Sequence, residues 1–520
     1  MKKILLLFTL LSPSYIFGQG LDARINEQFA PIADWWESFV LTSIPLTDTI
    51  GLPIVLIILI GGATFFTFYF SFVNVRKFGL AISTVRGKYD HVEHGEEPIT
   101  TDTVNVVEGD IVDTIRIEGQ EGEVSHFQAL AAAVSGTVGL GNIAGVAIAI
   151  VVGGPGATFW MILAGLLGMS SKFVECTLGV AYRDVDDSGR VYGGPMYYLS
   201  RGLKERGFNG LGKTLAILFA VLCIGASFGG GNMFQSNQAA NQIISQFGLQ
   251  SGAAGSIFGV IFAILVAMVI IGGIKRIGNI AEKIVPFMAV LYVLSCLAVI
   301  FLNLDKVGEG ISLIFTEAFN PTAVAGGFVG VLITGFRRAA FSNEAGVGSA
   351  AIAHSAVKTR YPASEGIVAL LEPFIDTVVI CTMTALVIIM TGNYLNPDGL
   401  NGVDLTTFAF ESSIPGSSYI LTLAIVLFAF STMLSWSYYG LQSWMYLFGR
   451  GRLTDLTYKV LFLIFIVIGA ASTLDAVVKF SDAMILAMVF PNMIGLMFLF
   501  PRVRQELRKY LDAIKTSIAS

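Results

Sequence analysis

The sequence predicts an all-α membrane protein that crosses the bilayer about eleven times. Of its 520 residues, 54% are apolar and only 13% are charged, and the mean hydropathy is +0.73. So few charges could not cover the surface of soluble domains of this total size, whereas a lipid-facing surface needs none. This composition excludes a water-soluble enzyme. The net charge of −5 and the lack of a basic, aromatic-rich block also indicate no nucleic-acid partner.

The chain begins with a predicted cleavable secretory signal at residues 1–20. Two lysines precede a short apolar core, and small residues follow near Gly18 and Gly20, which is the pattern of an exported leader that is too short to span. An uncleaved re-entrant segment is the weaker alternative. Residues 21–72 are then a periplasmic segment followed by a first transmembrane helix.

Eleven apolar runs beyond the signal are long enough to span a bilayer. They lie near 51–72, 129–152, 157–181, 214–233, 254–272, 284–302, 324–350, 366–391, 418–447, 460–474 and 482–500.

The basic residues give these spans an orientation. If the mature N-terminus is exported, the connections on the cytoplasmic side hold 24 of the 32 Lys and Arg residues, as the positive-inside rule requires. Those connections are 73–126, 182–213, 273–283, 354–365, 448–459 and the tail from 501. We therefore expect a multi-pass protein of the bacterial inner membrane with a cytoplasmic C-terminus.

The longest polar insertion is the stretch 87–126 within the first cytoplasmic connection. It alternates β-branched and acidic residues, so a small β-hairpin and a flexible loop are both open. The four cysteines each fall inside a different apolar run and are expected to be buried, with neither disulfides nor metal spacing. They are Cys176, Cys223, Cys296 and Cys381.

An internal repeat divides the membrane region. The pattern Asn-x-Ala-Gly-Val occurs at Asn142–Val146 and again 201 residues later at Asn343–Val347. The offset equals five spans, and because five is odd, the two copies enter the membrane from opposite sides. We therefore expect two inverted five-helix repeats at 127–302 and 303–500, with 51–72 as an additional helix and 501–520 as a tail.

Both copies of the pattern favour discontinuous helices. Gly136, Gly139, Gly141 and Gly145 fall within ten residues, and each costs a helix interior about 1 kcal/mol relative to alanine. Backbone freed inside a bilayer is tolerated where it lines a polar cavity, which in inverted repeats indicates a transporter's central site. The alternative, that the glycines only allow close helix packing, explains less well why polar residues accompany them.

The motifs around the first break closely resemble those of the alanine/glycine:cation symporter family. They are VGLGN at 138–142, GGPGATFWMILAGLLGMSSKFVECTLGVAYR at 153–183, GGGNMFQSNQ at 229–238, FSNEAGVGSAAIAH at 341–354, LEPFIDT at 371–377 and FAFSTMLSWSYYG at 428–440. The resemblance implies a leucine-transporter fold and sodium-driven uptake of a small neutral amino acid, alanine or glycine, by alternating access. It implies membrane lipid as the surroundings, and neither an organic cofactor nor an obligatory protein partner.

An amino-acid zwitterion needs backbone N–H groups for its carboxylate and carbonyls for its ammonium group. We expect the donors around Val138 to Gly141 and the carbonyls around Phe341 to Asn343. The expected substrate-binding residues are Thr137, Val138, Gly139, Gly141, Asn142, Asn232, Gln235, Phe341, Ser342, Asn343 and Trp436. Asn232 and Gln235 are placed at the outer end of the fourth span, and Phe341 and Trp436 are candidates for the wall that limits side-chain size.

By resemblance to the fold's common sodium site, sodium would be bound by oxygen atoms of five residues. These are the carbonyls of Ser135, Val138 and Phe428 and the hydroxyls of Ser431 and Thr432. The alternative is that the two hydroxyls only bond back to carbonyls of their own helix.

Charged residues inside the spans are functional candidates because each is costly unless it is paired. Lys172 and Glu175 are three residues apart and are expected to pair within their helix. Arg337 and Arg338 are expected to form an outer gate with a carboxylate that the sequence does not identify. Three more carboxylates, Glu344, Glu372 and Asp376, could carry a proton.

Three other functions were weighed against a sodium-coupled carrier. A membrane-embedded hydrolase is disfavoured because His91, His94, His126 and His354 all map to loops or helix ends, which leaves no Ser/His pair inside the bilayer. A passive channel would need a continuous polar stripe, whereas polarity here concentrates at two breaks. A proton-coupled amino-acid transporter remains the main alternative.

Overall fold

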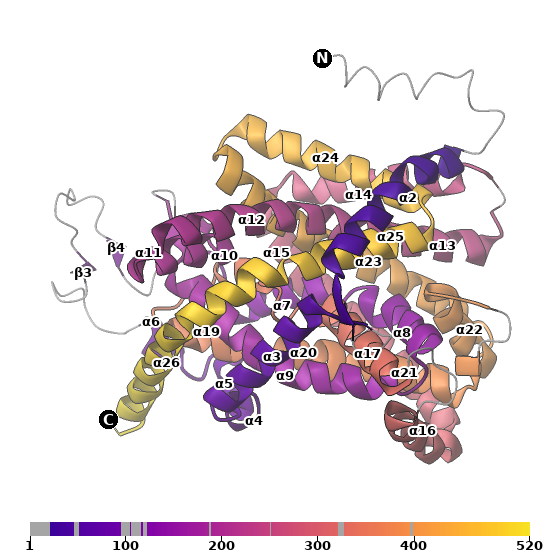
Figure 1. Cartoon of the computed structure of the whole chain (residues 1–520), viewed down its shortest axis with the longest axis horizontal. Coiled ribbons are helices and arrows are strands. Elements are labelled where there is room, and N and C mark those ends of the chain that lie inside the picture. The colour runs from indigo at the N-terminus through magenta and orange to yellow at the C-terminus, as the bar shows by residue number, and fades with distance from the viewer. Residues whose placement is uncertain are drawn as a thin grey trace.

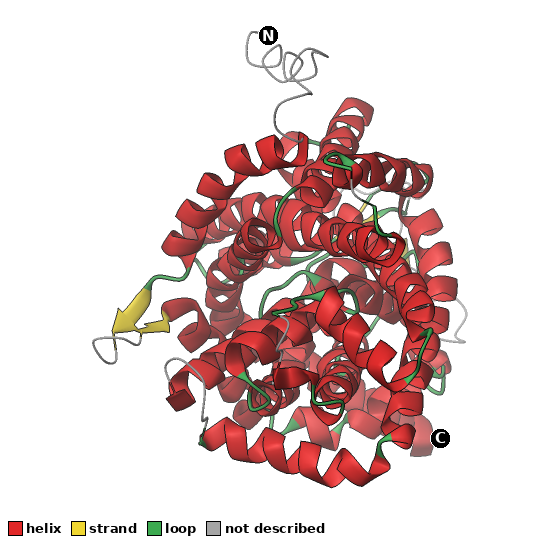
Figure 2. Ribbon diagram, turned by 90° about the vertical axis from the view of Figure 1, so that its right-hand side faces the viewer, coloured by secondary structure: helices red, strands yellow, loops and turns green. Residues whose placement is uncertain are grey.

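The computed structural model describes residues 21–45, 51–94, 104–105, 116–117, 122–186, 189–249, 251–320, 327–395 and 399–519. The predicted signal at 1–20 lies outside these residues. Helices fill the molecule, and a small strand pair projects from its edge (Figure 2). The strands form three antiparallel pairs: β1 (Ser43–Pro45) with β2 (Gly51–Pro53), β3 (Val104–Asn105) with β4 (Arg116–Ile117), and β5 (Asp184–Val185) with β6 (Val191–Tyr192). The β3–β4 pair shows that the 87–126 insertion contains a hairpin.

The N-terminal region precedes the predicted repeats. Its helices are α2 (Leu21–Val40), α3 (Ile54–Tyr69), α4 (Val73–Arg76), α5 (Phe78–Val85) and α6 (Asp90–His94). The apolar helix α3 packs against α9 and α26, and α2 lies along α25 (Figure 1).

The first predicted repeat contains one broken helix and four further long helical segments. Its elements are α7 (His126–Thr137), η4 (Gly141–Gly145), α8 (Val146–Gly153), α9 (Ala157–Ala181), α10 (Pro195–Tyr197), η5 (Tyr198–Gly202), α11 (Leu203–Glu205), α12 (Asn209–Phe228), η6 (Gly229–Met233), α13 (Phe234–Phe247), α14 (Ala254–Ile270) and α15 (Gly273–Leu302). A Ser125–Gln128 capping box starts α7.

The second predicted repeat begins with a second broken helix. Its elements are η7 (Leu304–Lys306), α16 (Val307–Phe319), α17 (Gly327–Asn343), α18 (Ala350–His354), α19 (Pro362–Val368), α20 (Leu371–Pro373), η8 (Phe374–Cys381), α21 (Thr382–Met390), η9 (Asn393–Leu395), α22 (Val403–Ser413), α23 (Ser417–Phe448), α24 (Arg452–Ala471), α25 (Leu474–Ala487) and α26 (Val489–Ala519).

Ten of the eleven predicted spans coincide with apolar helices, which confirms an all-α membrane protein; the exception is 324–350, where α17 is not among the apolar helices of the described residues. Within the described residues, seven helices are long and apolar enough to cross a bilayer, an eighth is the bent pair α7 and η4–α8, and α3 and α14 are shorter apolar helices. The count of eleven and the repeat boundaries stay predictions. Helices α2, α16 and α22 lie in segments that the sequence predicted only as connections between spans. The predicted tail from 501 is a continuation of helix α26.

The two broken helices lie against each other in the core. Helix α17 packs against η4 and α8, and α18 packs against α7 and α9. Long helix α23 then packs against α7, α12, α13 and α15. The breaks are thereby surrounded by protein rather than lipid, which is the condition for leaving a helix interrupted at membrane depth.

Candidate functional site between two broken helices

The first break lies between Thr137 and Gly141, where the glycine-rich sequence predicted it. The helix axes on either side differ by 51°. Two backbone donors freed by the break bind side chains: the Gly139 N–H donates to Asn142 Oδ1 at 2.9 Å, and the Leu140 N–H donates to Gln235 Oε1 at 3.0 Å. At the first break, two backbone N–H groups are therefore bonded to side-chain amide oxygens rather than to helix carbonyls.

The second break follows Asn343, at the end of α17. Glu344 has φ of +55°, and Gly346 and Gly348 also have positive φ, so the chain turns sharply before α18 begins. Asn343 Oδ1 accepts the Ala345 N–H at 3.0 Å, and Asn492 Nδ2 donates to the Gly346 carbonyl at 2.9 Å. The last carbonyls of α17 carry the negative end of the helix dipole, and Ser342 in this last turn lies next to Gly141 of the first break.

One carboxylate joins both breaks. Asp376 of η8 accepts Asn142 Nδ2 on Oδ1 at 2.6 Å and Ser342 Oγ on Oδ2 at 2.9 Å. Thr377 Oγ1 also donates to Oδ2 at 2.6 Å and receives Asn343 Nδ2 at 2.9 Å. Asp376 is fully buried, and no Lys, Arg or His of the described residues pairs with it. An ionised carboxylate that is buried without a cation is unfavourable, so Asp376 needs either a positively charged ligand or a proton.

Aromatic rings close the space beside the first break. The Phe341 ring packs edge-on against Phe234 with ring centroids 5.0 Å apart, and its Cδ1 lies 3.5 Å from where a Cβ on Gly141 would be. Trp436 packs over Gly231, and its indole N–H donates to Glu344 Oε1 at 3.0 Å. Of the two predicted wall residues, Phe341 therefore touches the break directly.

Helix α23 is bonded to α7 along a polar seam. Ser135 Oγ donates to the Ser431 carbonyl at 2.9 Å, and Ser435 Oγ donates to the Ala132 carbonyl at 2.9 Å. Between these bonds, the buried Thr432 Oγ1 has no hydrogen-bond partner among the described residues. It lies 2.3 Å from where a Cβ on Gly139 would be, so this free hydroxyl faces the break.

Comparison with known proteins identifies the family. A family model described as the sodium:alanine symporter family matches residues 38–519. The chain belongs to the sodium:alanine symporter family. It is a transporter and not an enzyme, and the resemblance read from the motifs is confirmed.

Individual relatives agree with this assignment. The chain is 40% identical to the sodium/alanine symporter AgcS of Methanococcus maripaludis over 401 residues, which cover 76% of this chain and 86% of AgcS. It is 36% identical to the probable sodium/glutamine symporter GlnT of Bacillus subtilis, over 74% of this chain and 78% of GlnT. The crystal structure of MhsT in complex with L-phenylalanine matches with a TM-score of 0.50 and 15% identity, covering 76% of this chain and 99% of MhsT. This likeness confirms the leucine-transporter fold.

Three predicted site residues point away from the breaks. Thr137 Oγ1 donates back to the Ala133 carbonyl, and Ser431 Oγ donates back to the Phe428 carbonyl at 3.0 Å. Asn232 Nδ2 donates to the Phe462 carbonyl of α24 at 2.7 Å. The placement of Asn232 and Gln235 at an outer helix end is wrong, because η6 and α13 continue the helix to Phe247. Both residues are buried within the helix, and of the two only Gln235 reaches the break.

The expected pair between Lys172 and Glu175 is also wrong. Lys172 Nζ bonds instead to Glu372 Oε1 of α20 at 3.1 Å, and both side chains are fully buried. Glu175 Oε1 accepts Asn492 Nδ2 at 2.8 Å. A side chain from a packed neighbouring helix approaches Lys172 here, whereas a local spacing rule considers only residues of the same helix.

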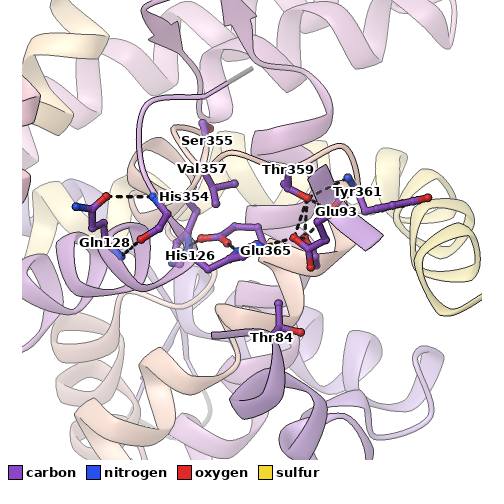
Figure 3. Close-up of polar contacts among 12 residues, drawn as sticks. Thr84, Glu93, His126, Gln128, His354, Ser355, Val357, Thr359, Tyr361 and Glu365 are labelled. Atoms are coloured by element: carbon purple, nitrogen blue, oxygen red, sulfur yellow. Dashed lines mark hydrogen bonds and ion pairs between the residues drawn. The ribbon is translucent and has the colours of Figure 1, made fainter. Parts of the chain in front are cut away.

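A row of buried ionisable groups leads from this lysine through Glu372 to the start of α7, and Figure 3 shows the part of it from His354 to Glu93. Glu372 lies 3.5 Å from His354 Nε2, and His354 Nδ1 lies 2.5 Å from Glu365 Oε1. Glu365 also contacts His126 Nδ1, whose Nε2 contacts Glu93. His126 meets a carboxylate through each nitrogen, so both of its nitrogens must donate unless a carboxyl group holds the proton. His354 hydrogen-bonds only through Nδ1, because its Nε2 has no hydrogen-bond partner among the described residues.

The residue cluster in Figure 3 also connects α7 to segments that are distant along the chain. Glu93 of α6 accepts Thr359 Oγ1 at 3.1 Å and Tyr510 OH of α26 at 2.8 Å. On the neighbouring turn, Gln128 Nε2 donates to Glu282 Oε2 of α15 at 3.0 Å. The first half of the broken helix is thus held at the side predicted to be cytoplasmic.

The arginine pair that was predicted to form an outer gate lies on α17. The structure identifies the carboxylate that both arginines contact. Arg337 Nε lies 2.7 Å from Asp482 Oδ2 of α25, and Arg338 contacts the same carboxylate. Arg337 Nη2 also lies 2.5 Å from Glu37 Oε1 of α2. The sequence could not identify Asp482 or Glu37 because neither is near the arginines along the chain.

Proposed function

We propose that the protein carries a small neutral amino acid, alanine or glycine, into the cell together with sodium by alternating access. The observation that carries this proposal is the meeting of two helix breaks at the buried carboxylate of Asp376. Among the residues that the structure describes, no cationic side chain pairs with this carboxylate. A cationic substrate group or a sodium ion would supply the missing charge. The names of AgcS and GlnT support coupling to sodium.

The substrate carboxylate would bind at the first break. The N–H groups of Gly139 and Leu140 would exchange the amide oxygens of Asn142 and Gln235 for carboxylate oxygens, which are stronger acceptors. The ammonium group would then lie against the last carbonyls of α17, with Asp376 behind them. Both ends of the zwitterion would be held by groups fixed on helix ends, which reduces the entropy lost on binding.

Sodium would bind on the other side of the first break, at Thr432. An oxygen atom that is buried and without a partner costs free energy unless something binds it, and a hard cation prefers hydroxyl and carbonyl ligands. The carbonyls of Ser135 and Val138, at the end of α7, would complete the ligand set. Ser431 would contribute less than predicted, since its hydroxyl bonds to its own helix.

A small side chain is favoured over a large one by the Phe341 ring. The ring is buried against Gly141, Gly230 and Phe234, and a packed wall of this kind yields little to a larger ligand. GlnT is named as a probable glutamine symporter, so glutamine is the second candidate substrate. A glutamine side chain would have to displace Phe341.

Alternating access would use the two ion-pair clusters as gates. The Arg338–Asp482 contact would open toward the outside, and the His126 contacts with Glu93 and Glu365 would open toward the cytoplasm. Both sets are formed in this structure, so the breaks are closed off at each end. The basic-residue distribution supports a cytoplasmic C-terminus, and the proposed location is the bacterial inner membrane.

Proton coupling is the second candidate, and the row of ionisable groups between Glu93 and Lys172 favours it. Chains of Asp, Glu and His inside a membrane protein are typical proton relays. In this alternative, Asp376, Glu372 or Glu344 would hold the proton, and Thr432 would have no role in coupling.

Uptake into proteoliposomes distinguishes the two candidates. Purified full-length protein would be given radiolabelled alanine under an inward sodium gradient at equal pH, or under a pH gradient without sodium. Accumulation above equilibrium in the first condition alone supports the proposal. Accumulation in the second alone would reject sodium coupling, and equilibration in both without accumulation or counterflow would indicate a passive pore.

A further inference from the structure

A cavity that is remote from the helix breaks opens where α15 and α24 begin. It has a volume of about 380 Å³ and lies between the loop that joins α14 to α15, the second half of α23 and the first turns of α24. It shares no lining residue with either break. By the basic-residue distribution, this is the cytoplasmic side of the membrane.

The lining of this cavity is strongly cationic. It contains four basic side chains, Arg190, Arg450, Arg452 and Lys459, and one acidic side chain, Asp455. Lys459 Nζ bonds to Asp455 at 2.8 Å. Within the described parts of the chain, neither Arg190 nor Arg452 forms an ion pair. The Arg190 side chain bonds to Tyr192, a neutral group, so no contacting carboxylate neutralises either charge.

Arg450 is held in an ion pair with Asp184, which it shares with Arg201. Its Nη2 lies 2.6 Å from Asp184 Oδ2, and Arg201 bonds to the other oxygen at 2.8 Å. Burial acts to raise the pKa of Asp184, but hydrogen bonds from Arg201 and Arg450 hold it below its ordinary value. The carboxylate is therefore ionised at neutral pH, and Arg450 is fixed in place rather than available.

Two long helices begin at the cavity. Gly272 precedes α15 and Gly451 precedes α24, and neither helix has a side chain that caps its first N–H groups. Such groups, with the positive end of the helix dipole, bind anionic oxygens.

Gln442 gives an independent indication of a ligand. It lines the cavity, is only 2% exposed, and its Oε1 has no hydrogen-bond partner among the described residues. Buried amide oxygens are nearly always bonded. This one would accept a hydroxyl group of a bound molecule after its side chain turns toward the cavity, because the oxygen itself is buried in this structure.

The surface beside the cavity is apolar and faces lipid. Helices α14 and α24 lie side by side (Figure 1), and large apolar side chains are exposed along both. They are Ile264 and Met268 on α14, Ile271 directly after it, and Leu456 and Val460 on α24. Ile271 is 67% exposed and also lines the cavity, so the apolar surface continues to its mouth.

We propose that this cavity binds the headgroup of an anionic phospholipid that carries hydroxyl groups, of the phosphatidylglycerol class. The phosphate lies at the starts of α15 and α24 beside Arg190 and Arg452, a headgroup hydroxyl donates to Gln442, and the acyl chains lie along α14 and α24. Basic pockets at the cytoplasmic ends of membrane helices bind such headgroups. A soluble phosphate monoester has the same headgroup chemistry but makes no use of the apolar surface.

Native mass spectrometry of the full chain in detergent tests the proposal. Phosphatidylglycerol, phosphatidic acid and phosphatidylcholine would be titrated separately, and soluble glycerol 1-phosphate would be added as a competitor. We expect phosphatidylglycerol to bind best, and glycerol 1-phosphate not to displace it at equal concentration. Arg190→Gln with Arg452→Gln should weaken phosphatidylglycerol binding about 25-fold, at about fivefold for each cation.

Two further variants keep the result interpretable. Arg206→Gln removes an exposed arginine in the same predicted connection as Arg190 but outside the cavity, and should leave lipid binding unchanged. Gln442→Leu should remove the preference for phosphatidylglycerol over phosphatidic acid, whose headgroup has no glycerol hydroxyls. Equal binding of phosphatidylcholine, or unchanged binding by the double variant, would overturn the proposal. Displacement by glycerol 1-phosphate at equal concentration would reassign the cavity to a soluble anion.

Discussion

Replacing Gly139 with alanine should disable sodium coupling, because the new methyl group would occupy the space between the first break and α23. Its carbon would lie 2.3 Å from Thr432 Oγ1, which is 1.1 Å less than the 3.4 Å at which ordinary contact begins. The Ser135–Ser431 and Ser435–Ala132 hydrogen bonds hold the two helices together here, so they cannot separate freely. Overpacking of this kind costs roughly 1 to 3 kcal/mol, or about a fivefold to hundredfold loss of sodium affinity.

The assay is the sodium concentration that half-activates alanine uptake in proteoliposomes. Gly145→Ala is the matched control, because it adds the same methyl group to the same break where the nearest atom is 4.0 Å away. It should transport normally. Adding Thr432→Ala to Gly139→Ala would relieve the overlap but remove the hydroxyl, so sodium activation should stay weak. Normal sodium activation in Gly139→Ala, or full recovery in the double variant, would refute the assignment of Thr432 as a ligand.

The remaining predictions concern the same site. Thr432→Val keeps the shape and removes one oxygen, so we expect weaker sodium activation at unchanged protein abundance; an unchanged activation curve would exclude the hydroxyl. Gly141→Leu places its Cβ 3.4 Å from the Ser342 backbone and its further carbons beyond, so alanine binding by scintillation proximity should be lost while membrane insertion persists. Phe341→Ala should let valine and leucine compete with alanine, whereas a uniform loss of binding would make Phe341 a structural residue. Asp376→Asn keeps the size and one acceptor oxygen but removes the charge, so uptake should fall at least tenfold; full activity would show that the carboxylate is protonated and takes no part in charge balance.

The broken helices could be predicted because their causes are local. Glycine lowers the cost of interrupting a helix wherever it occurs, so Gly139 and Gly141 mark the first break without knowledge of the fold. The same reasoning placed Asn142 and Asn343 at the breaks. For Ser431 and Thr432, the sequence left open whether the hydroxyls are free or bond back to their own helix. The packing of α23 on α7 shows that the Ser431 hydroxyl bonds back and that the Thr432 hydroxyl has no partner among the described residues.

The partners of the buried charges could not be predicted, because each comes from a distant part of the chain. Lys172 pairs with Glu372 at a separation of 200 residues, and Asn142 meets Asp376 at 234. A spacing rule sees only neighbours within a helix, and it therefore paired Lys172 with Glu175. The length of the fourth helix was underestimated for a related reason: the polar run after Asn232 resembles a helix end, yet it is buried against α23 and α24.

The most direct test of the central claim is alanine-driven sodium flux. Proteoliposomes with equal sodium on both sides would receive radioactive sodium ions and an inward gradient of alanine. We expect alanine to drive net sodium uptake, with Gly145→Ala behaving like the unaltered protein and Gly139→Ala losing the flux. Sodium entry that does not respond to alanine, while alanine itself still enters, would contradict sodium-coupled symport through the site between the two broken helices.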